Sequence, residues 1–117
     1  MSYPPEIINE SDRLYFGTLE LLSRAQCLRF EAEGDHFGRR MSSVPVLWDR
    51  KIQLESSERD LRLRCEEFLG ALQDSLRNRI ADGASDSQIE ETRAFIRHVE
   101  GMVVTIDAAS NVLYGLR

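Results

Sequence analysis

Three long segments of this chain repeat apolar residues every three or four positions, and two short segments rich in glycine, serine and aspartate separate them. That spacing places the apolar residues along one face of an α-helix. We therefore expect an all-α fold with helices over about residues 5–33, 44–82 and 86–114, packed as an elongated antiparallel bundle. A chain of 117 residues is the size of one domain, so residues 1–117 should share one core.

Residues that favour helix ends set these predicted boundaries. Pro5 and Pro45 suit the first turn of a helix because the proline ring fixes φ. Gly34 and Gly83 are placed to end the first and second helices, since glycine adopts positive φ without strain. Two capping-box spacings compete at the start of the third helix. They are Ser85 with Gln88 and Ser87 with Glu90.

The second predicted helix contains a polar segment, residues 55–60, that leaves two alternatives, a kink or a continuous helix. Leu54 and Leu61 flank this segment and are seven residues apart, close to two helical turns. The apolar positions therefore stay in phase across it, and we expect the helix to be continuous.

The two cysteines are predicted to remain free thiols. Along an antiparallel hairpin of the first two helices, Cys27 and Cys65 differ in level by roughly 20 Å at a rise of about 1.5 Å per residue. A disulfide requires Cα atoms within about 7 Å of each other. Cys65 lies on the apolar stripe and should be buried, whereas Cys27 follows the polar Gln26 and should be partly exposed.

The charge balance argues against several partners. The net charge is −5 and the isoelectric point is about 5.0, whereas nucleic-acid-binding domains usually carry a basic patch. No apolar run approaches the roughly 20 residues that cross a bilayer. We therefore expect a soluble, cytoplasmic protein that binds neither nucleic acid nor membrane, and whose partner is another protein or a second copy of the chain.

The sequence predicts no catalytic residue, no cofactor and no metal site. The one local arrangement of metal ligands is Glu33-x-x-His36. Di-iron helical bundles use the Glu-x-x-His motif twice, together with further glutamates. Because the motif occurs once here and Gly34 lies inside it, we interpret it as an acidic helix end.

One pattern keeps an enzymatic alternative open. Arg93 followed by His98, and Arg29 followed by His36, resemble the Arg-x4–6-His pattern of HEPN-type ribonucleases, which are small all-helical proteins. That family prefers a polar residue directly after the arginine, whereas Ala94 and Phe30 stand there in this chain. The resemblance covers only these few residues and implies, as the alternative function, a HEPN-like ribonuclease that needs no metal.

The apolar stripes are wider than one small bundle can cover, which favours an interaction surface. The candidate interface residues are Trp48, Arg50, Tyr15, Leu19, Leu22, Val103 and Ile106. For the single tryptophan, packing in the core and anchoring a partner are both open. We expect a non-enzymatic module for protein–protein interaction or oligomerisation, such as an adaptor, a chaperone or a structural subunit, whose bundle is completed by self-association.

Overall fold

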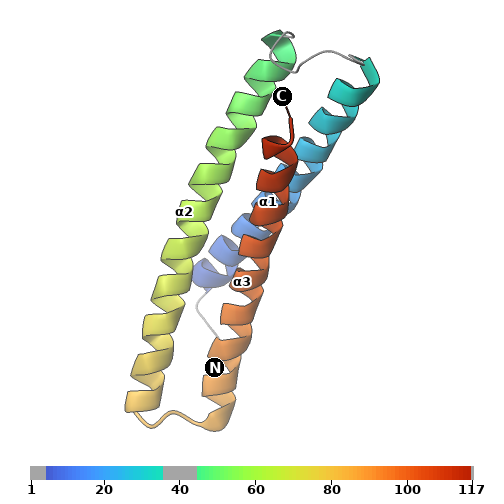
Figure 1. Cartoon of the computed structure of the whole chain (residues 1–117). Coiled ribbons are helices and arrows are strands. Elements are labelled where there is room, and N and C mark those ends of the chain that lie inside the picture. The colour runs from blue at the N-terminus through green and yellow to red at the C-terminus, as the bar shows by residue number, and fades with distance from the viewer. Residues whose placement is uncertain (1–4, 36–44, 117) are drawn as a thin grey trace.

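A computed structural model describes residues 5–35 and 45–116, and within them the chain forms three α-helices. They are α1 (Pro5–Asp35), α2 (Pro45–Ala81) and α3 (Asp86–Tyr114). The helices alternate in direction, so that α1 and α3 are parallel to each other and antiparallel to α2 (Figure 1). The molecule measures 61 × 21 × 18 Å. The predicted all-α, elongated antiparallel bundle of three long helices is confirmed.

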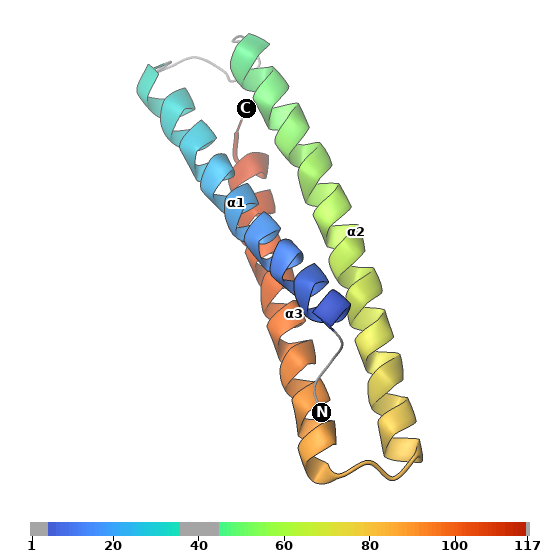
Figure 2. The same cartoon turned by 180° about the vertical axis from the view of Figure 1, so that it is seen from behind.

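The three helices are staggered along the bundle. Helix α1 begins beside the middle of the α2–α3 pair, so the lower ends of α2 and α3 extend past it as a two-helix hairpin (Figure 2). In this hairpin the rings of Phe68 and Phe95 stack with their centroids 5.8 Å apart. The stagger is a shift of α1 along the bundle and not a matter of length, because α1 has 31 residues and α3 has 29, while α2 has 37.

The observed ends of α1 and α2 differ slightly from the prediction. Helix α1 continues through Gly34 to Asp35, so the prediction that Gly34 ends this helix is wrong. A glycine inside a helix costs about 1 kcal/mol relative to alanine, which a long packed helix tolerates. Helix α2 begins at Pro45 in the described residues, as its fixed φ favours, and the predicted first position, 44, lies outside them.

The turn between α2 and α3 forms as predicted, and the structure decides between the two capping boxes. Gly83 has a φ of 76°, in the left-handed region that favours glycine. The Ser85 hydroxyl accepts a hydrogen bond from the Gln88 backbone N–H, and the Gln88 side chain accepts one from the Ser85 N–H, both at 3.2 Å. Ser85 is therefore the N-cap of α3, and the alternative box starting at Ser87 is not used.

This cap gives a direct test of the α2–α3 turn. Replacing Ser85 with alanine removes the acceptor of the Gln88 N–H, and we expect it to lower the free energy of unfolding by about 1 kcal/mol. Urea unfolding followed by circular dichroism measures the change. Ser87→Ala is the matched control, and we expect it to change stability by less than about 0.5 kcal/mol. Equal losses in the two variants would contradict the assignment of the cap.

Helix α2 is continuous through residues 55–60, as predicted, and Glu58 of this polar segment pairs with an arginine that reaches α3. The Arg62 guanidinium reaches Glu58 on its own helix and Asp107 on α3, each at 2.7 Å. These two hydrogen-bonded carboxylates raise the pKa of Arg62, with Asp107 the larger cause. The Glu58–Arg62 pair, four residues apart, supports the helix across this segment.

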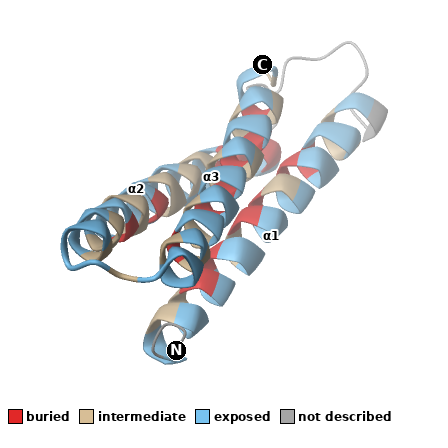
Figure 3. Ribbon diagram, turned by 90° about the horizontal axis from the view of Figure 1, so that it is seen from below, coloured by how far each residue is buried: buried red, intermediate tan, exposed pale blue. Residues whose placement is uncertain are grey.

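Two clusters of buried apolar residues form the core, and all three helices contribute to each (Figure 3). The upper cluster consists of Leu21, Ala25, Leu28, Leu47, Leu54, Ala109 and Leu113. The lower cluster consists of Leu14, Cys65, Leu72, Val99, Met102 and Ile106. Leu61 packs against both clusters, so one core runs along the bundle. The thiol predictions are confirmed, since Cys65 is buried, Cys27 is exposed and both are free.

Candidate protein-interaction surface

Charged residues are distributed unevenly around the bundle, and one face carries few of them. This face, which we call the α1/α3 face, lies on the side of α1 and α3 that α2 does not cover. It consists of Ile8, Tyr15, Leu19, Leu22 and Gln26 of α1, and of Ala94, His98, Gly101, Thr105, Ala108 and Val112 of α3. None of these residues is Asp, Glu, Lys or Arg, although 30% of the chain is charged.

In the middle of α1, the charges are confined to the flank that faces α2. Between Leu14 and Leu28 the only charged residues are Glu20 and Arg24, which form an ion pair at 2.5 Å and line a cavity between α1 and α2. The opposite flank of α1 carries Tyr15, 38% exposed, and Leu19, 40% exposed. The apolar side chains of this flank are therefore in contact with solvent.

On α3, the second half of the helix is almost free of charge. From Gly101 to Gly115 the only charged residue is Asp107, and its carboxylate reaches Arg62 of α2. The flank of α3 next to α1 carries small side chains instead. A Cβ added at Gly101 would meet no atom within 4 Å, so the surface above this glycine is open. The α3 half of the α1/α3 face therefore carries mostly small, uncharged side chains.

The two halves of the face meet at Tyr15 and His98, whose ring centroids are 5.2 Å apart. Farther up the same seam, Arg29 of α1 and Val112 of α3 line one small cavity of about 190 Å³. Helices α1 and α3 thus form one continuous surface. The Arg29–Glu33 ion pair lies at the upper end of its α1 half.

The predicted interface residues lie in different parts of the structure, some on the surface and others in the core. Tyr15 and Leu19 are exposed on the α1/α3 face, and Leu22 is half-buried beside them. Val103 is half-buried and packs against the lower core cluster. Ile106 is 0% exposed, so its assignment to an interface is corrected to the core. A helical stripe contains both core residues and flank residues, and its spacing alone does not distinguish them.

Trp48 and Arg50 lie on α2, away from Tyr15 and Leu19. Trp48 is 36% exposed, and the Lys51 ammonium lies 4.9 Å from the centre of its ring. Lys51, the only lysine in the chain, is 8% exposed and donates a hydrogen bond to Glu55 at 3.1 Å. Arg50 forms an ion pair with Glu31 of α1. Trp48, Lys51 and Arg50 therefore already have partners within the chain. Of these contacts, the Arg50–Glu31 ion pair links α2 to α1.

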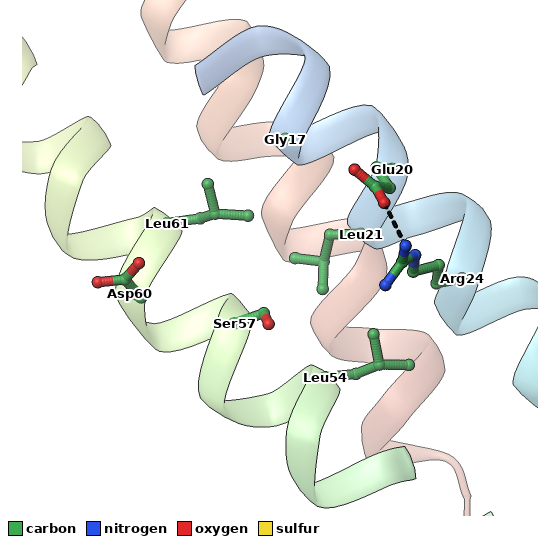
Figure 4. A pocket seen from close by; sticks show the side chains of 8 residues that line it. All are labelled: Gly17, Glu20, Leu21, Arg24, Leu54, Ser57, Asp60 and Leu61. Atoms are coloured by element: carbon green, nitrogen blue, oxygen red, sulfur yellow. Dashed lines mark ion pairs between the residues drawn. The ribbon is translucent and has the colours of Figure 1, made fainter. Parts of the chain in front are cut away.

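Sequence reasoning did not find the groove between α1 and α2 (Figure 4). A cavity of about 220 Å³ lies over Leu21, Leu54 and Leu61, with Glu20, Arg24, Ser57 and Asp60 among the residues at its rim. A neighbouring hollow of about 300 Å³ shares Arg24 and reaches Cys27 and Arg50. Gly17 is the residue in the sequence that could have indicated this close approach of α1 to α2, because an added Cβ there would lie 3.0 Å from a Leu61 methyl group.

The charged groups around this groove already have partners within the chain. Arg24 pairs with Glu20, Asp60 pairs with Arg64, and Arg50 pairs with Glu31. A ligand-binding pocket usually offers a few polar groups that converge on the ligand. Because these ion pairs lie on the surface of the helices and neutralise each other, the groove offers a charged ligand no free counter-charge.

Among the described residues, the arrangements considered for chemistry are not assembled within one chain. Arg93 and His98 are five residues apart on α3, which places their Cα–Cβ directions about 140° apart around the helix. His98 packs on Tyr15, and Arg29 pairs with Glu33. The predicted partner of Arg29, His36, lies outside the described residues. Among residues 5–35 and 45–116 no three His, Cys, Asp or Glu side chains are grouped to hold a metal ion.

Comparison with known proteins identifies no family for this chain. No protein-family model, curated protein or solved structure matches the chain. Within the described part of the chain, no helix has a stretch that is both long enough and apolar enough to cross a membrane. The function of the chain is therefore inferred from its surface.

Proposed function

We propose that this chain is a non-enzymatic module for protein–protein interaction, an adaptor, chaperone or structural subunit that binds its partner through the α1/α3 face. The observation that carries this proposal is the scarcity of charge on a face that spans two helices, which is uncharged from Tyr15 to Gln26 on α1 and from Gly101 to Val112 on α3, in a chain with 30% charged residues. Such faces are typical of docking surfaces, because burying an unpaired charge in an interface is costly whereas burying apolar side chains is favourable.

The exposed aromatic and aliphatic groups provide the binding energy in this proposal. Fully burying a large apolar side chain contributes about 1.5 to 3 kcal/mol, and Tyr15 and Leu19 each keep about 40% of their surface in contact with solvent. Covering them would therefore contribute on the order of 1 kcal/mol each. The free thiols of Cys27 and Cys65 support work in a reducing compartment, and we propose the cytoplasm.

The proposal is tested by capturing partners in the cells that make this protein. We expect affinity-tagged chain, cross-linked before lysis, to recover a defined partner, and the Leu19→Glu variant to lose it. Leu63→Glu is the matched control, because Leu63 is 54% exposed on α2 and lies outside the α1/α3 face. Mass spectrometry compares the three samples, and a second copy of the chain counts as a partner.

Two outcomes would contradict the proposal. The first is recovery of the same proteins with all three chains, which would show that the α1/α3 face binds none of them. The second is cleavage of single-stranded RNA by the purified chain without added metal, lost in a folded His98→Ala variant. That result would favour the HEPN-like ribonuclease instead.

A further inference from the structure

We draw no further inference here: the strongest candidate, the apolar surface patch around Tyr15 and Leu19 on the α1/α3 face, carries nothing beyond the proposed function because nothing in the structure shows what covers it.

Discussion

Replacing Ile106 with alanine is expected to lower the free energy of unfolding by about 3 kcal/mol. Ile106 is 0% exposed and belongs to the lower core cluster with Leu14, Val99 and Met102. Removing its outer carbons leaves a cavity that long, straight helices cannot close by collapsing. For a domain whose total stability is about 5 to 15 kcal/mol, this is a large fraction. Urea unfolding followed by circular dichroism, at about 1 μM so that the chain is monomeric, measures the loss.

The control lies two residues away on the same helix. Val104 is 66% exposed, and Val104→Ala should change stability by less than about 0.5 kcal/mol. If Ile106→Ala instead left the unfolding of the monomer unchanged and only weakened association, Ile106 would lie at an interface, as sequence analysis expected. The comparison therefore tests directly the correction that the structure makes to the predicted interface.

The second large effect concerns the two thiols. Under native conditions we expect a thiol reagent to modify Cys27 at least about 1,000-fold faster than Cys65. Cys27 is exposed, whereas Cys65 is 0% exposed in the lower core cluster and reacts only when the bundle opens. For a stability of 5 kcal/mol or more, the open population is below about 1 in 1,000. Burial also raises the pKa of the Cys65 thiol, which reduces the fraction of reactive thiolate further.

The same burial predicts how stability depends on pH. Because the pKa of Cys65 is higher in the folded chain than in the unfolded chain, its contribution is fully present below the unfolded value, near 9.0. It is lost as pH rises from there through the folded value, since the unfolded thiol ionises first. The free energy of unfolding should therefore fall above about pH 9, and the Cys65→Ala variant should lose this part of the alkaline dependence.

Absorbance of the released reagent anion follows the thiol kinetics, and the Cys27→Ser variant isolates the slow phase. In denaturant both thiols should react at similar rates. Equal rates in the native protein would show that Cys65 is accessible. A disulfide between Cys27 and Cys65 would contradict the antiparallel hairpin itself, because it requires Cα atoms within about 7 Å.

Features that depend on neighbouring residues along one helix could be predicted from the sequence. The apolar spacing predicted three helices, and the seven-residue step from Leu54 to Leu61 predicted that α2 continues through its polar segment. Gly83 and the Ser85–Gln88 pair predicted the turn before α3, because cap and turn chemistry acts within a few residues. The positions of Cys27 and Cys65 along a hairpin predicted free thiols.

Only the tertiary structure decided which side of each apolar stripe another helix covers. Ile106 and Leu19 both lie on such stripes, yet α1 and α2 cover Ile106, whereas Leu19 stays exposed beside α3. The α1/α3 face likewise exists only because α1 and α3 are parallel and adjacent, with the Glu20–Arg24 pair of α1 and Asp107 of α3 on the flanks toward α2. Apolar spacing predicts which residues lie on the buried side of a helix or at its edge. It does not predict which distant segment packs there, because that depends on the lengths, the stagger and the crossing angles of all three helices.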